Sequence, residues 1–246
     1  MELSGTIEKA VEVLFHLHRE ASPCGVTAIG RALGLPKSTA HRLLTALGRR
    51  GLVERDERGR YRPGIALVAL GIGVLEHEPV VVAAEPMLEE TAKDVGETVF
   101  LAAARSGRLI VLDKREGSGF LRAAPRVGAE IPVHATAIGK VYLAFAPALL
   151  APAPLTEFTP RTTTDPKQLA QELERVRNRG WAENEDEWTA GLAGVAAPVQ
   201  VRGRLVAAIA IAGPTSRLSR DQRGHFVARV RDAAERVAAR LEGRSR

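Results

Sequence analysis

The chain has 246 residues, 45% hydrophobic and 26% charged, which are the proportions of a globular protein rather than a disordered one. Lysine and arginine outnumber aspartate and glutamate by 35 to 29, giving a formal net charge of +6. A lone cysteine, Cys24, excludes an intramolecular disulfide and a multi-cysteine zinc site, and the lack of a signal peptide or long apolar run predicts a cytoplasmic protein.

The N-terminal residues predict three helices. Apolar residues at helical spacing predict the first over residues 6–19, and the turn “ASPCG” ends it. A second, short helix over residues 26–33 leads into “GLP”, where Gly34 is a natural helix stop and Pro36 is tolerated in the first turn of the next helix. The stretch “AIGRALGLPKSTAHRLLTAL” therefore predicts a helix-turn-helix.

The third helix, within residues 35–50, has two different faces. At about 3.6 residues per turn, one face collects the apolar residues Ala40, Leu43, Leu44 and Leu47. The opposite face collects the polar residues Ser38, Arg42, Thr45 and Arg49, with His41 beside them. A polar face of this kind is equally typical of simple exposure to solvent, so its function depends on the residues around it.

A short basic hairpin is predicted directly after this helix. The stretch “GLVERDERGRYRPG” alternates polar and apolar residues over 52–55 and 60–62 around a charged turn, as in the wing of a winged helix-turn-helix. Residues 31–62 contain nine basic and three acidic residues, so this window alone carries a charge of +6. Because duplex binding depends largely on phosphate neutralisation, the clustering favours DNA binding.

We predict that the third helix enters the major groove of DNA. Arg42 can read guanine through two hydrogen bonds, whereas Arg49 and the wing arginines are expected to contact phosphates. The predicted DNA-binding residues are Thr27, Lys37, Ser38, Thr39, His41, Arg42, Thr45, Arg49, Arg58 and Arg60.

An apolar helix is predicted over residues 65–78 despite Gly71 and Gly73, each of which costs roughly 1 kcal/mol relative to alanine. Such a helix needs a packing partner, and a second copy of the chain is the natural candidate. We therefore divide the chain into a winged helix-turn-helix domain (1–64), a linker helix (65–78) and an effector-binding and oligomerisation domain (79–246).

The C-terminal part predicts helices mixed with mostly antiparallel strands, an α+β fold. Helices are expected over 80–95, 137–145, 166–179 and after a capping box at Ser219 and Gln222. Strands are expected within “ETVFLAAARSG” (97–107) and “RLIVLDKREG” (108–117) and near 181–184, 194–201 and 204–212.

Motifs of common enzymes are missing from the sequence. Around Gly139 and Lys140 the phosphate-loop pattern fails, because His134 and Val141 stand at two required positions. The six histidines are scattered without metal-ligand spacing, and no Gly-x-Ser-x-Gly elbow occurs. The acidic run “ENEDE” (183–187) is expected to be a solvated loop. We therefore predict neither catalysis nor a cofactor or metal.

Several stretches together resemble the isocitrate lyase regulator (IclR) family of bacterial transcription factors, nearly from end to end. “AIGRALGLPKSTAHRLLTALGRRGLVERDERGRYRPG” is similar to its winged helix-turn-helix, and “IPVHATAIGKVYLAF” to its His-Ala-(Ser/Thr)-x-x-Gly-Lys stretch. “RGWAENEDEWTAGLAGVAAPV” and “AAIAIAGP” resemble its C-terminal signature. The resemblance implies a GAF-like effector domain with an antiparallel sheet, dimers joined through the DNA-binding domains and linker helix, tetramers in many members, and control by a small metabolite.

The resemblance also implies where an effector binds. The family's pocket positions here hold Ala137, Ile138, Asn184, Gly194, Ala210 and Ala212. Members that bind small carboxylates such as glyoxylate or pyruvate use polar groups at these positions, and burying a carboxylate without donors is costly. We therefore expect a larger, less polar effector, aromatic or acyl, or no effector. A register shifted by one or two residues would instead bring Glu185 or Glu187 into the family's acidic position.

The sequence thus predicts an effector-controlled DNA-binding regulator, with repression favoured, that binds a near-palindromic operator as a homodimer or homotetramer and has no membrane partner. Two alternatives stay open. In an enzyme or sensory module whose basic N-terminal domain contacts a partner, duplex binding would not depend on Ser38, Arg42 and Thr45. In an architectural protein that binds DNA without sequence preference, Arg42→Ala would weaken binding to all duplexes alike.

Overall fold

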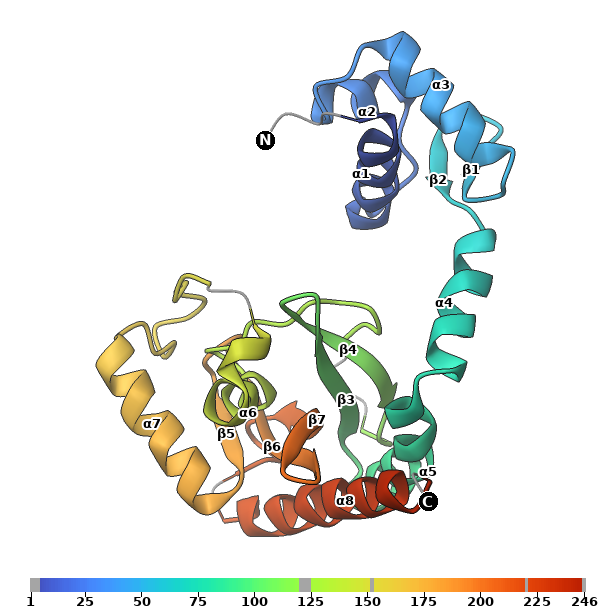
Figure 1. Cartoon of the computed structure of the whole chain (residues 1–246). Coiled ribbons are helices and arrows are strands. Elements are labelled where there is room, and N and C mark those ends of the chain that lie inside the picture. Colours follow the sequence, from blue (N-terminus) through green and yellow to red (C-terminus); the bar gives the residue numbers. More distant parts are fainter. Residues whose placement is uncertain (1–4, 120–124, 151–152, 220, 245–246) are drawn as a thin grey trace. The chain divides into compact units, whose positions relative to one another are not determined.

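The computed structural model describes residues 5–119, 125–150, 153–219 and 221–244 (Figure 1). The chain divides into two compact units, residues Met1–His77 and Glu78–Arg246. Among the described residues no single helix is long and apolar enough to cross a membrane; only α4 (Ala66–Glu76) and α5 (Pro79–Val95), taken together as an interrupted pair, reach the required length and composition.

The N-terminal unit has three helices, a hairpin and a fourth helix. Its elements are α1 (Thr6–Arg19), α2 (Val26–Ala32), α3 (Lys37–Gly48), β1 (Val53–Arg55), β2 (Tyr61–Pro63) and α4. The predicted apolar face of α3 is confirmed, because Leu43 and Leu44 are buried against Val13 and Leu17 of α1 and Ile29 of α2. This core orients α3 so that its polar face is left in solvent.

The turn between α2 and α3 depends on two glycines. Gly34 has the left-handed backbone conformation (φ +64°), which agrees with its predicted role as a helix stop. A Cβ atom on Gly30 would lie 2.9 Å from the carbonyl oxygen of Leu35, so the two helices approach closely here. The third helix is shorter than predicted: it begins after Pro36 and ends at Gly48, and Arg49 is its C-terminal cap.

The C-terminal unit is built on one antiparallel sheet of five strands in the order β4-β3-β7-β6-β5. The strands are β3 (Thr98–Arg105), β4 (Arg108–Arg115), β5 (Ala182–Glu185), β6 (Leu192–Val201) and β7 (Arg204–Pro214). The helices are α5, α6 (Ala137–Phe145), α7 (Pro166–Arg179) and α8 (Arg223–Arg244), with a short 3-10 helix at Pro147–Leu149.

Both faces of this sheet are covered. Helices α5 and α8 cover one face, and α6 and α7 cover the other (Figure 1). Val99 and Leu101 of β3 pack into the core with α5 and α8, whereas Phe100 and Ala102, which alternate with them, face the core with α6 and α7. Because both faces are buried, the sequences of the strands are nearly continuous apolar runs. The predicted start of the last helix is also wrong: α8 begins at Arg223, so Ser219 does not cap its first turn.

Candidate functional site

The polar face of α3 is exposed to solvent. The side chains of Ser38, Arg42 and Thr45 are exposed, and Arg49 is exposed where the helix ends. Thr45 donates its hydroxyl to the carbonyl oxygen of His41 (2.8 Å), one turn back, so this hydroxyl is free only to accept. Of the other predicted DNA-binding residues, Thr27, Lys37, His41 and Arg58 are exposed, whereas Thr39 and Arg60 are half-buried.

The basic residues of this region fall into two groups. Arg60 pairs with Asp56 (3.0 Å) and Arg62 with Glu54 (2.9 Å), so both guanidinium groups are committed to the hairpin. Arg42, Arg49 and Arg58, by contrast, have no ion-pair partner within the described ranges. Their charge is available to an external anion.

Acidic side chains fix the shape of the hairpin. Asp56 accepts hydrogen bonds from the backbone N–H (2.8 Å) and the side chain of Arg60, and the backbone bond in particular holds the pKa of its carboxyl below the usual value. Glu54 accepts the backbone N–H of Ile65 (3.0 Å), which joins the hairpin to the residue before α4. These hydrogen bonds give the wing a defined conformation.

Helix α4 is apolar on all sides except for its last residue, Glu76, yet none of its residues is buried within the chain. Leu70 and Val74 are 62% and 67% exposed. Helix α1 presents a smaller apolar stripe of Ile7, Val11 and Phe15, also exposed. Large exposed apolar patches are typical of surfaces that contact another molecule.

In the C-terminal unit, a cavity of about 190 Å³ lies between the start of α6 and the sheet. All six residues predicted for the effector pocket line it: Ala137, Ile138, Asn184, Gly194, Ala210 and Ala212. Phe100, Ile131 and Trp188 form much of its apolar wall.

The register of the sheet explains why these residues meet. Asn184 on β5 lies opposite Gly194 on β6, which in turn lies opposite Ala212 on β7, so the three form a row across neighbouring strands. Their side chains are small, which leaves room above the sheet. The start of α6 closes this space, where the hydroxyl of Thr136 accepts the backbone N–H of Gly139 (3.1 Å) and caps the helix.

Position 184, rather than 185 or 187, faces the cavity. Neither Glu185 nor Glu187 lines it: Glu185 pairs with Arg223 (2.8 Å), and Glu187 pairs with Lys140 (2.7 Å). Asn184 accepts the backbone N–H of Ala137 through its Oδ1 atom (3.0 Å), which ties β5 to the start of α6.

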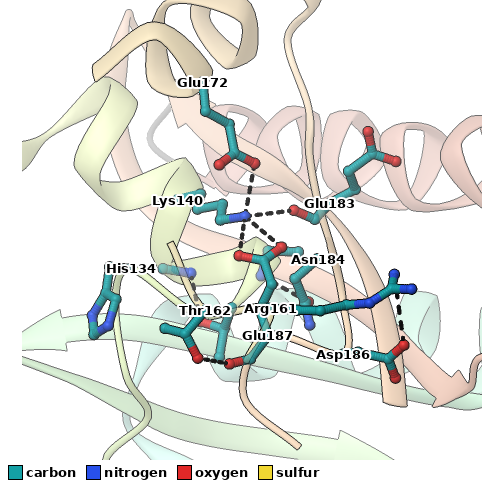
Figure 2. Close-up of polar contacts among 12 residues, drawn as sticks. His134, Lys140, Arg161, Thr162, Glu172, Glu183, Asn184, Asp186 and Glu187 are labelled. Carbon is teal, nitrogen blue, oxygen red and sulfur yellow. Dashed lines mark hydrogen bonds and ion pairs between the residues drawn. The ribbon is translucent and has the colours of Figure 1, made fainter. Parts of the chain in front are cut away.

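Lys140 is fully buried and is the centre of a group of charged residues that the sequence did not reveal (Figure 2). Its ammonium lies 2.7 Å from carboxylate oxygens of both Glu172 and Glu187 and 3.2 Å from the carbonyl oxygen of Glu183. Burial raises the pKa of Glu187, although Lys140 opposes that shift.

The expectation of a solvated loop at 183–187 is therefore wrong. Glu183 pairs with Arg179 and Arg223, and the hydroxyl of Thr162 donates to the carbonyl oxygen of Glu187 (2.6 Å; Figure 2). This arrangement could have been predicted from the alternation of side chains along a β-strand, which places Glu183 and Glu185 on the face opposite to Asn184. The acidic residues bind cations of neighbouring elements and so hold the cavity wall in place.

The chain matches two protein-family models. The IclR helix-turn-helix domain matches residues 6–57, and the C-terminal domain of bacterial IclR transcriptional regulators matches residues 72–239. The HTH-type transcriptional regulator XynR of Escherichia coli (strain K12) is 32% identical over 240 residues, 95% of each chain. The HTH-type transcriptional repressor AllR of Salmonella typhi is 29% identical, covering 96% of this chain and 89% of the relative.

A solved structure gives the same similarity in three dimensions. An IclR homologue from Microbacterium hydrocarbonoxydans, crystallised in complex with 4-hydroxybenzoate, superimposes with a TM-score of 0.83 at 25% identity. The superposition covers 97% of this chain and 100% of the homologue, so the similarity includes both units.

Proposed function

Because the chain belongs to the IclR family of bacterial transcriptional regulators, we propose that it represses transcription from a near-palindromic operator and that an effector in the C-terminal cavity controls this binding. It is a DNA-binding regulator with an effector domain rather than an enzyme. As a regulator that binds DNA, it is proposed to act in the cytoplasm.

The observation that carries the DNA-binding surface is the set of cations on and after α3 that have no ion-pair partner among the described residues. Arg42, Arg49 and Arg58 are exposed, while the acidic residues of the hairpin are bound to other arginines. An unpaired guanidinium can bind a phosphate, or guanine at two atoms, without first breaking an internal ion pair. We assign base reading to Arg42 with Ser38 and Thr45, and phosphate contacts to Arg49 and the wing.

Two copies of the chain are proposed to pair through the exposed apolar residues of α4 and α1. Covering Leu70, Val74 and Phe15 would remove a large apolar surface from water. A pair related by twofold symmetry would place two α3 helices in successive major grooves, so the half-sites would lie about one helical turn, or a multiple, apart. Assembly into a tetramer would require a further contact of the C-terminal unit.

The cavity is proposed to bind an aromatic or acyl effector. Its described wall is apolar apart from a few groups, and the Microbacterium homologue was crystallised with an aromatic compound, 4-hydroxybenzoate, which supports an aromatic ring in the ligand. For the carboxylate of that compound the described wall of this chain offers no cation. An effector can act only through different affinities for the DNA-binding and non-binding states. A thermal-shift screen would compare aromatic and acyl metabolites with glyoxylate and pyruvate; strongest stabilisation by the small acids would contradict the apolar cavity.

The DNA-reading role is tested with Arg42→Ala. The purified protein is first used to select genomic fragments, which supply the operator. Arg42→Ala is then measured against the operator and its single-base variants, and we expect discrimination at one base position to fall by about 1–3 kcal/mol. Arg240→Ala, which removes an equal charge from an exposed position of the C-terminal unit, is the control and should leave discrimination unchanged.

The outcome separates the alternatives. Equal weakening on every duplex would indicate a binder without sequence preference. Unchanged binding after substitution of Ser38, Arg42 and Thr45 would indicate that the basic unit contacts another partner.

A further inference from the structure

The side-chain amide of Asn184 has a defined orientation. Its atom 3.0 Å from the backbone nitrogen of Ala137 must be the carbonyl oxygen, because that N–H can only donate. The amide NH2 group is consequently directed elsewhere. Within the described part of the chain nothing accepts a hydrogen bond from it, and Asn184 lines the cavity. The cavity therefore contains a donor that has no acceptor among the described residues.

Gly194 provides the space that this orientation needs. It lies directly opposite Asn184 in the pairing of β5 with β6. A Cβ atom at position 194 would lie 3.0 Å from Asn184 Oδ1 and 3.3 Å from the carbonyl oxygen of Ile211. Any side chain there would press on the Asn184 amide, so the two residues function as a matched pair.

The described lining of the cavity carries no charged side chain. Lys140, three residues along α6 from Ala137, is held by Glu172 and Glu187 and cannot serve as a counter-charge. Of the N–H groups at the helix start, those of Ala137 and Gly139 are already bonded to Asn184 and Thr136, and only that of Ile138 has no acceptor among the described residues. Because the described lining offers no cation, a carboxylate would be less well compensated for its lost hydration than a neutral carbonyl oxygen, which needs one donor.

We propose that the effector carries a neutral carbonyl group, as an ester, amide or ketone, on an apolar body. The Asn184 amide donates to the carbonyl oxygen, Gly194 keeps that amide in place, and the body lies against Phe100, Ile131 and Trp188. This inference rests on the proposed role of the cavity as the effector site.

The variant Asn184→Asp separates this role from a purely structural one. Aspartate has nearly the same shape and still accepts the N–H of Ala137, but it presents a second oxygen where asparagine presents its NH2 group. The link between β5 and α6 is retained and the donor is lost. Asn178→Asp, an identical change at an exposed position on α7, is the matched control.

Three probes of one size test the carbonyl. Acetophenone has a ketone, α-methylstyrene has a CH2 group in place of the ketone oxygen, and benzoate has a carboxylate. Titration calorimetry with the full chain should show that acetophenone binds about fivefold more tightly than α-methylstyrene, the value of one hydrogen bond, and more tightly than benzoate. Asn184→Asp should reduce this ratio to about one; Asn178→Asp should preserve it.

Contrary results are equally specific. Tighter binding of benzoate, equal binding of acetophenone and α-methylstyrene, or a preserved ratio in Asn184→Asp would overturn the carbonyl inference alone. If none of the three probes binds, the cavity does not accept small aromatic molecules, and both this inference and the proposed aromatic effector fail. Operator binding and the role of Arg42 are measured separately and are unaffected by either result.

Discussion

Helices α4 and α6 are both strongly apolar, but the chain treats them in opposite ways. In α4 no residue is buried, and Leu70 and Val74 are mostly exposed. In α6 seven residues are buried, including the charged Lys140. Apolar composition therefore shows that the surface of a helix must be buried, but it can be buried by the same chain or by another molecule. Substitutions in the two helices should accordingly affect different measurements.

The largest effect is expected from Lys140→Met in α6. Removing the ammonium leaves the carboxylates of Glu172 and Glu187 close together, partly buried and without their cation. Breaking such a buried pair by removing one partner costs about 3–5 kcal/mol in the free energy of unfolding. Urea unfolding followed by tryptophan fluorescence measures this cost, because Trp181 and Trp188 both lie in the C-terminal unit.

Lys93→Met is the control for that prediction. Lys93 pairs with Glu89 at the surface of α5 and is 75% exposed, so its loss should change stability by less than about 1 kcal/mol. The second variant Lys140→Met/Glu187→Gln should recover part of the loss, because it removes one of the uncompensated charges. Equal losses for Lys140→Met and Lys93→Met would show that the buried cluster adds nothing.

A smaller energetic effect, with a different readout, is expected from Val74→Glu in α4. Val74 is exposed within the chain, so helix content and the unfolding of the C-terminal unit should stay unchanged. If α4 is covered by a second copy, burying a glutamate there weakens the free energy of association by about 2 kcal/mol per copy. The dissociation constant should then rise at least tenfold. Sedimentation over a concentration series measures the change.

Val127→Glu provides the comparison for α4. Val127 is also an exposed valine, but it lies in a loop of the C-terminal unit. Its substitution should leave the dissociation constant unaltered. An unchanged association state in Val74→Glu would mean that α4 is not the contact between copies.

The smallest effect is the pH dependence that Glu187 contributes. Burial raises its pKa above the ordinary 4.5, so the folded protein holds this proton more tightly than the unfolded chain does. Through this group, acidification in the interval above pH 4.5 stabilises the fold, and raising the pH removes that stabilisation. When the pH is lowered from about 7 to about 5, the free energy of unfolding should therefore increase less for Glu187→Gln than for the wild type. Superimposable pH profiles would contradict the assignment.

Local patterns were sufficient for most elements of this fold. The predicted bounds of α1 and α6 coincide with those of the structure, because apolar spacing and breakers such as “ASPCG” are properties of neighbouring residues. Where a boundary depends on packing, prediction was less accurate. Ser219 has the residue type of a cap, yet the first turn of α8 forms only at Arg223.

The sequence by itself determined the family, the order of the elements, the apolar face of α3 and the concentration of positive charge, since each of these is encoded by nearby residues or by quoted motifs. The tertiary structure alone decided which arginines are free. It also set the row of Asn184, Gly194 and Ala212 across three strands and joined Lys140 to Glu172 and Glu187. The physical reason is that strand register and burial bring together residues far apart in the chain, and no local pattern encodes those distances.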